Sequence, residues 1–216
     1  PAANVDFLDP SFRQPSVWKA NIAFDTELPW YGVVFSAEFL HTKNKDAIYY
    51  ENLNLGAPTK IGTDGRNLYY NAGGYQASCY SANNGTVTIT PNCVTSKALS
   101  NLSYGNVMLA KGTDLGEANV GTVSFSRPLT KGFGWSIAAT KTTSTEVSSL
   151  TSSVSTSNWN GRSVFNPNEN VATNSSYLVK DRINALLNFQ KKFFGSYNTR
   201  LGVFYEGRSG KPYSWT

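Results

Sequence analysis

The sequence has few of the residues on which enzymes and metal sites depend. Its 216 residues include one histidine, one methionine and two cysteines. His41 has no second histidine beside it, and its nearest carboxylates are Glu38 and Asp46, which is too little for a catalytic triad. Two thiols without a nearby histidine cannot complete a tetrahedral zinc site. We therefore expect no enzymatic activity and no cofactor.

Long apolar runs and dense charge are also missing. No stretch of eighteen apolar residues occurs, which excludes a transmembrane helix. The 19 Lys and Arg residues against 14 Asp and Glu leave a net charge of +5. Apart from Lys191-Lys192 the basic residues are scattered singly, so the sequence lacks the basic footprint of nucleic-acid binding, and no nucleic-acid partner is expected.

Alternating segments dominate what is present. Between Val17 and Leu53, two arms alternate apolar and polar residues with period two, and Glu27-Leu28-Pro29-Trp30 reverses the chain between them. Similar hairpins are predicted over 117–141, with the turn in 127–132, and over 182–205, with the turn in 194–198. The sequence thus predicts an all-β chain of about six antiparallel, up-and-down strands.

Two environments suit such hairpins. In a β-sandwich the apolar face packs against a second sheet, whereas in a membrane barrel it meets lipid and the polar face lines a wet interior. Trp30 and Tyr31 beside a short turn favour lipid, because aromatic residues gather at membrane interfaces. A barrel would place the following residues on one uncovered surface, and a sandwich would bury them: Trp18, Ile22, Phe35, Trp135, Ile137 and Leu187.

The remaining segments are expected to form irregular or external structure. Residues 1–16 are predicted as an irregular lead-in, and 142–170 as a strand end followed by an external loop. Residues 51–111 are predicted as a long external loop with short strands at 67–70 and 86–90. Long loops of this kind are typical of the cell-surface end of a barrel.

The long loop carries the candidate ligand-binding residues. Tyrosines interleaved with Asn and Gly are suited to binding a sugar, a peptide or a siderophore. The alternative is that these tyrosines pack the loop against itself. The candidates are Tyr49, Tyr50, Tyr69, Tyr70, Tyr75, Tyr80 and Arg66. Cys79 and Cys93 are expected to form a disulfide worth about 3 kcal/mol, with two free thiols as the alternative. The segments 64–65 and 166–170 offer oxygen atoms to calcium but lack the spacing of a known calcium loop.

Two blocks of the sequence carry recognisable motifs. The first contains DPSFRQP at 9–15, VWKAN at 17–21, ELPW at 27–30, LHTKNKDA at 40–47 and Tyr49-Tyr50; the second is YEGRSGKPYSW at 205–215. Both blocks resemble the β-barrel of TonB-dependent outer-membrane receptors and are most similar to the Oar-like branch. The matching residues are architectural, and none is a catalytic position.

The resemblance implies a setting and partners. It implies an arc of a large transmembrane β-barrel of about twenty-two strands with a plugged lumen, in the outer membrane of a Gram-negative bacterium. The implied partners are outer-membrane lipid, an external ligand and, through a plug, the TonB energy-transducing complex. The chain opens without a signal peptide, so we expect residues 1–216 to be part of a barrel domain without its plug, N-terminal domain and other strands. Open strand edges would then pair with missing strands or with a second copy.

Overall fold

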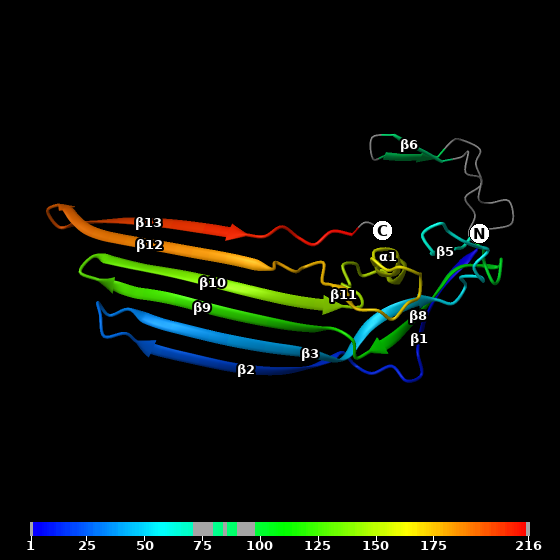
Figure 1. The fold of residues 1–216 in the computed structure, drawn as a ribbon, viewed down its shortest axis with the longest axis horizontal. Coiled ribbons are helices and arrows are strands. Elements are labelled where there is room, and N and C mark those ends of the chain that lie inside the picture. The colour runs from blue at the N-terminus through cyan, green and yellow to red at the C-terminus, as the bar shows by residue number, and fades with distance from the viewer. Residues whose placement is uncertain (1, 71–79, 84–85, 90–97, 215–216) are drawn as a thin grey trace.

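The structure, a computed structural model, describes residues 2–70, 80–83, 86–89 and 98–214. A mixed sheet of many strands dominates it (Figure 1). The strands of this sheet are β1 (Ala3–Leu8), β2 (Ser16–Glu27), β3 (Val34–Asn52), β8 (Tyr104–Thr113), β9 (Glu117–Thr130), β10 (Phe133–Glu146), β11 (Thr173–Asn174), β12 (Asp181–Phe194) and β13 (Tyr197–Arg208). Two small sheets and one helix lie outside it: β4 (Lys60–Ile61) with β5 (Asn67–Leu68), β6 (Tyr80–Asn83) with β7 (Thr86–Ile89), and α1 (Ser155–Asn160). In the described part of the chain, no helix is long and apolar enough to cross a membrane.

Six long strands form the three predicted hairpins. These are β2–β3, β9–β10 and β12–β13, and antiparallel pairing of β3 with β9 and of β10 with β12 joins them in chain order. Their turns lie at one end of the sheet, on the left of Figure 1, and the long connecting segments lie at the other end. Within the described residues, β2 and β13 each pair on one side only, so the sheet is open at both edges.

The turns of the second and third hairpins are tighter than the sequence predicted, whereas the first is longer: residues 28–33 join β2 to β3, with Tyr31 and Gly32 at positive φ. The second hairpin reverses through Lys131 and Gly132 alone, both with positive φ, at 54° and 84°, as a two-residue hairpin turn requires. The predicted turn over 127–132 was therefore wrong in extent, since β9 runs to Thr130 and contains Pro128. The strand tolerates this proline because the β9–β10 register shifts opposite it, between Phe133 and Trp135, and a bulge needs no regular ladder bond.

Three further predictions need correction. Residues 3–8, predicted as irregular, form β1, which pairs with β8 in parallel, so the sheet is mixed and not purely antiparallel. Residues 104–111, predicted as loop, belong to β8, which continues the register of β9 along β3. The loop predicted after β10 contains the short helix α1. The short strands expected at 67–70 and 86–90 are present over shorter ranges, as β5 (Asn67–Leu68) and β7 (Thr86–Ile89).

The pairing register gathers the apolar side chains on one face of the sheet. Directly paired residues of neighbouring strands share a face, and one row runs from Phe35 through Phe125 and Ile137 to Ala185. We call this surface the apolar face; its members include Trp18, Ile22, Phe24, Phe35, Phe39, Val123, Phe125, Trp135, Ile137, Ile183, Leu187 and Val203. The rings of Phe24 and Phe35 lie 6.3 Å apart and those of Phe35 and Phe125 5.1 Å apart, which ties the first hairpin to the second.

The opposite face is polar. One row on it runs from Glu38 through Thr122 and Thr140 to Arg182. Glu38 accepts a hydrogen bond of 2.8 Å from the Asn21 side chain, and the hydroxyls of Thr122 and Thr140 lie 3.1 Å apart. The alternation read from the sequence is therefore present in space, with small hydroxyl and amide side chains behind the apolar face.

We expect Gly132→Ala to destabilise the fold more than Gly195→Ala. Both glycines occupy hairpin turns with positive φ, but a Cβ at Gly132 would lie 2.3 Å from the Gln190 carbonyl oxygen, whereas a Cβ at Gly195 would meet nothing within 4 Å. Gly195→Ala should cost about 1–2 kcal/mol from backbone strain alone, and Gly132→Ala should cost more. Denaturant unfolding of the two variants measures the difference, and equal losses would contradict this account of the turn.

Candidate functional site

Charged and aromatic side chains meet where β3 and β8 run past the apolar face. Tyr49 of β3 is only 2% exposed, and its hydroxyl donates to Glu51 at 2.9 Å. The same Glu51 oxygen accepts a bond of 3.0 Å from Lys111 of β8. The guanidinium of Arg162 lies 5.4 Å from the Tyr49 ring centroid, and Lys111 Nζ lies 5.9 Å from it. One buried ring thus contacts two cations, a favourable arrangement for its π electrons.

The environment shifts the proton equilibria of these groups, which lie outside the apolar part of the strands. Burial raises the pKa of Tyr49, and the hydrogen bond to Glu51 raises the pKa of Lys111. Burial lowers the pKa of Arg162. Because the tyrosine is held neutral and the lysine charged, the cluster has the charge pattern of a structural ion pair and not that of an acid–base pair.

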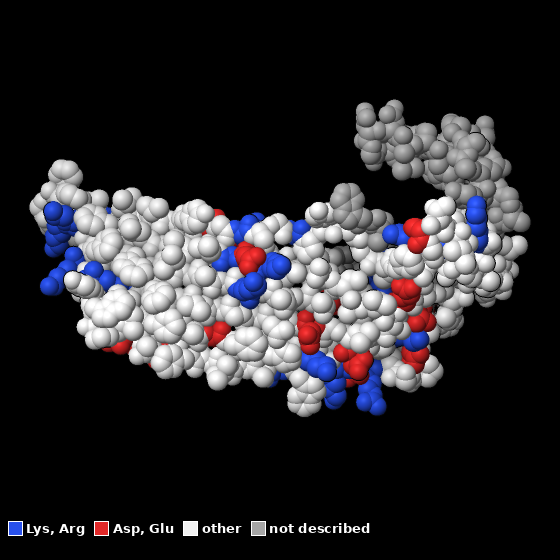
Figure 2. All heavy atoms as spheres, viewed as in Figure 1, with Lys and Arg blue, Asp and Glu red and all other residues white. Residues whose placement is uncertain are grey.

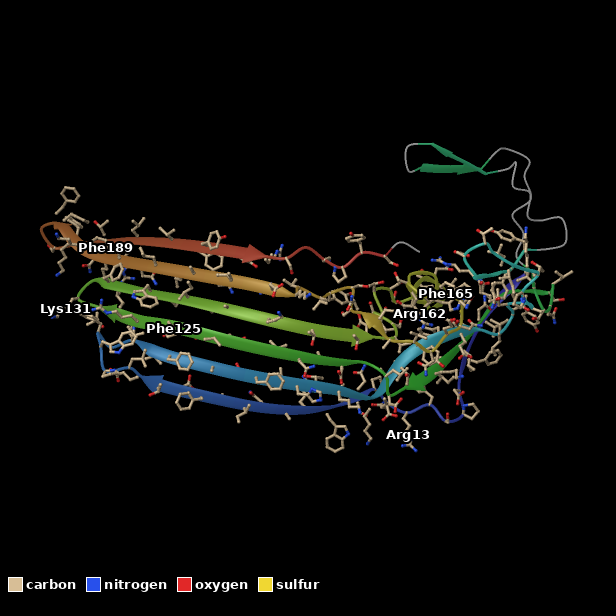
Figure 3. The ribbon with its side chains drawn as sticks, viewed as in Figure 1. Arg13, Phe125, Lys131, Arg162, Phe165 and Phe189 are labelled. Atoms are coloured by element: carbon tan, nitrogen blue, oxygen red, sulfur yellow. The ribbon has the colours of Figure 1, made fainter. Side chains whose placement is uncertain are left out.

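Arg162 also forms hydrogen bonds with the backbone of the segment that follows β10. Its Nε donates to the Val147 carbonyl oxygen at 2.9 Å, and its Nη2 donates to the Glu169 carbonyl oxygen. The two carbonyls come from opposite ends of the segment, so one side chain closes it into a loop. Figure 3 shows Arg162 and Phe165 in this region, near the far end of β3.

Asn168 caps the backbone of β3. Its side-chain oxygen accepts a bond of 2.8 Å from the Asn52 amide, and its side-chain nitrogen donates to the Asn52 carbonyl at 3.0 Å. The same oxygen accepts a bond of 2.8 Å from the Trp159 indole. β2 stops pairing with β3 at Asp46, so Asn168 supplies bonds that a neighbouring strand would otherwise provide.

The structure places the predicted ligand residues in different settings. Tyr49 is buried as described, and Tyr50 is half-buried in β3, paired with Ala110. Tyr69 and Tyr70 directly follow β5; the Tyr69 carbonyl accepts a bond from the Ala98 amide at 3.1 Å. Tyr80 pairs with Ile89 through the backbone of β6 and β7. Tyr75, Cys79 and Cys93 lie outside the described residues.

Arg66 joins the β4–β5 hairpin to the segment after α1. Its Nε lies 3.0 Å from the Asp64 carboxylate, and its guanidinium lies 5.5 Å from the Phe165 ring centroid. The Asn67 amide donates to the Asn166 side chain at 2.9 Å. Two loops that lie far apart in the sequence are therefore in contact.

The structural roles of Asn52, Asn166 and Asn168 were not predicted from the sequence. The only signal was the oxygen-rich segment 166–170, which was considered for calcium. In the structure the Asn166 and Asn168 oxygens accept bonds from backbone amides instead. Among the described residues, no group of three or more His, Cys, Asp or Glu side chains is placed to hold a metal ion.

Several recesses lie near this end of the sheet. A groove of about 390 Å³ on the polar face is lined by Thr140, Thr142, Ser144, Ser175, Tyr177 and Arg182, among others. A second recess, of about 370 Å³, lies where the segment between β1 and β2 passes β3 and β8. We call it the crossover recess; its lining includes Asp9, Ser11, Arg13, Lys45, Asp46 and Thr113. Both could hold a polar ligand.

Comparison of the chain with protein-family models, curated proteins and solved structures gave no match. A functional assignment therefore depends on the fold and on these sites.

We expect Asn168→Gly to lower the free energy of unfolding by about 2–4 kcal/mol, because it leaves the Asn52 amide and the Trp159 indole without their acceptor. Glycine also suits the positive φ of 66° at this position, so the variant isolates the side chain. Asn170→Gly, which removes one bond from Thr113, is the control and should cost about 1 kcal/mol. Denaturant unfolding measures both, and equal losses would show that Asn168 is not a cap.

Proposed function

We propose that the chain contributes wall and cell-surface structure to a TonB-dependent outer-membrane receptor of the Oar-like branch. In this proposal it is one arc of a transmembrane β-barrel, it has no enzymatic activity of its own, and its long segments contact an external ligand. The support is the motif resemblance together with the fold. The outer membrane of a Gram-negative bacterium is the corresponding location.

The observation that carries the proposal is the uncovered apolar face. Trp18 and Ile22 are 67% and 71% exposed, and Ile137 is 45% exposed. A face with this many large apolar side chains is far larger than the patches that soluble monomers leave in water. Lipid would cover it without a second layer of protein. The sandwich alternative, a secreted adhesin or carbohydrate-binding module, would need another sheet over these residues.

The height of the apolar face suits a bilayer. Nine residues, Gly132 of the turn and 133–140 of β10, separate Lys131 from Lys141. They extend about 30 Å along a strand at ~3.3 Å per residue, which becomes about 23 Å along the membrane normal at a tilt of ~40°. The apolar band of outer-membrane barrels is about 25 Å tall. Figure 2 shows an almost uncharged band on the face in view, with charged side chains gathered on either side of it.

The ends of the sheet also differ as they do in outer-membrane barrels. Short turns close one end and long segments extend from the other, as barrels do at their periplasmic and external sides. The unpaired edges of β2 and β13 are incompatible with lipid, since each unsatisfied backbone group there would cost several kcal/mol. The proposal therefore requires further strands to close the wall, and by family resemblance a plug that reaches the energy-transducing complex.

In a closed barrel that contains this chain, we expect Ile137→Arg to lower the free energy of unfolding in lipid vesicles by about 2–4 kcal/mol, the cost of a cation on the lipid face near mid-membrane. Ser136→Arg is the matched control, because Ser136 is the next residue on the same strand and lies on the polar face. It should cost less than about 1 kcal/mol. Comparable losses in both variants would argue against a membrane-facing surface.

Quenching of tryptophan fluorescence by brominated-chain phosphatidylcholine distinguishes lipid from a protein cover. Trp135 lies on the apolar face, whereas Trp159 belongs to α1 and bonds to Asn168. If lipid covers the face, Trp135→Phe should reduce the quenched share of the fluorescence, and Trp159→Phe should not. The proposal would be refuted if Trp135→Phe left the quenched share of the fluorescence unchanged, or if the parent protein showed no quenching.

A further inference from the structure

We propose that the apolar face, at the end where the short turns lie (left in Figure 1), binds the phosphate group of an anionic glycerophospholipid. Arg127, Lys131 and Lys191 contact the phosphate, and the adjoining apolar side chains contact the acyl chains. This inference rests on the proposed function, because it takes the apolar face to lie in a membrane. It adds a defined headgroup site to the hydrocarbon contact.

Arg127 is a charged residue within the apolar face. It pairs with Trp135, and Trp135 pairs with Leu187, so all three share that face. The rows on either side are uncharged: Thr26, Phe35, Phe125, Ile137, Ala185 and Tyr205 form one, and Thr130, Phe133, Phe189 and Leu201 form the other. A cation on a lipid-facing surface is costly unless it is paired or reaches the headgroups.

The described part of the chain offers Arg127 no partner of its own. The buried Nε of Arg127 has no hydrogen-bond acceptor among the described residues. Arg127 also takes part in none of the ion pairs between described residues. A guanidinium can donate two parallel hydrogen bonds to phosphate oxygens, and its long stem can extend along an apolar surface toward the headgroups. A lipid phosphate would therefore supply the acceptor that the chain does not.

Lys131 and Lys191 come together at the end of the same face. The Gln190 amide donates to the Gly132 carbonyl oxygen at 2.7 Å, so the turn of the second hairpin contacts β12 one residue away from each lysine. Figure 3 shows Lys131 at the tip of its hairpin, with Phe189 on the neighbouring strand. Two further cations thus lie beyond Arg127, on the side of the headgroups.

Aromatic rings accompany Lys191. Its Nζ lies 5.5 Å from the Phe193 ring centroid, and the rings of Phe189 and Phe193 lie 6.2 Å apart. Phe193 is 53% exposed. Aromatic side chains with lysine or arginine at the end of an apolar surface are typical of a membrane interface.

The charges at this end of the sheet favour an anion. Residues 126–134 and 186–202 contain no Asp or Glu. They contain five basic residues: Arg127, Lys131, Lys191, Lys192 and Arg200. The carboxylates at this end of the first hairpin, Asp25 and Glu27, pair with Ser36 and Val34 and so have positions on the polar face. An anion on the apolar side therefore meets an excess of positive charge.

A lipid phosphate fits this site better than a free phosphate ion. The cations adjoin the apolar side chains of Phe133 and Phe189, which acyl chains would cover and a soluble anion would leave uncovered. Each basic residue next to anionic lipid accounts for about a fivefold change in affinity. Loss of two such residues corresponds to about a thirtyfold weaker affinity.

The test uses dioleoylphosphatidylglycerol as the probe. It is added to a closed barrel that contains this chain, folded in detergent micelles, and binding is followed by native mass spectrometry. The double variant Arg127→Gln/Lys191→Gln should raise the Kd about thirtyfold. The matched control is Lys192→Gln/Arg200→Gln, which removes the same charge at the same end of the sheet but from the polar face. It should leave the Kd within about threefold.

Two competitors identify the group that is bound. Inorganic phosphate at the concentration of the lipid should not displace it. Dioleoylglycerol, which has the same acyl chains and no phosphate, should bind at least about thirtyfold more weakly than the phospholipid. Displacement by inorganic phosphate would indicate an ion site, and equal binding of dioleoylglycerol would indicate hydrocarbon contact alone. Either result would overturn the proposal.

An unchanged Kd in Arg127→Gln/Lys191→Gln, or an equal loss in the control, would also overturn it. The unfolding midpoint shows whether the double variant is folded. If it is not, Lys191→Gln alone, at the exposed end of β12, should raise the Kd about fivefold, and an unchanged value would count against the site. Quenching of Trp135 in the parent protein by brominated lipid tests the proposed function separately. Retained quenching with an unchanged Kd would remove only the headgroup site.

Discussion

The structure depends on one constraint, the pairing register that keeps the apolar side chains of six strands on one side of a single sheet. A slip of one residue in any hairpin would move that strand's apolar set to the polar face. Each large side chain is worth about 1.5–3 kcal/mol when removed from water, so the cost of a slip grows with every rung. The two-residue turn at Lys131 and Gly132, with both residues at positive φ, fixes the register of its hairpin.

The same constraint separates the molecule into zones of different chemistry. The strands supply a nearly uncharged band, and ionic and amide contacts gather where β3 and β8 continue beyond it. There the polar groups satisfy one another, as in the contacts of Tyr49 with Glu51 and Arg162. Asn168 closes the backbone of β3 where no strand is available. The six long strands and the far end of the sheet are thus continuous in backbone but are stabilised by different forces.

The hairpins were predictable from the sequence because alternation and turn residues are local signals. β1 and β8 were not, because their pairing joins residues far apart in the chain and β8 lacks strict alternation. Pro128 suggested a turn, yet a bulge lets β9 continue through it. The tyrosines of the long loop form a group by composition, but the structure buries Tyr49 and places Tyr69 beside the β4–β5 hairpin. Capping of a backbone edge by Asn168 leaves no pattern that a sequence alone displays.

The parallel pairing of β1 with β8 has a consequence for the order of folding. Ala3 pairs with Tyr104, so β1 must wait for about a hundred further residues of synthesis before its partner exists. Closing so long a loop is slow compared with forming a hairpin. The first hairpin, β2–β3, can therefore form before β1 docks, and the β1 segment stays accessible to chaperones and proteases until β8 is in place.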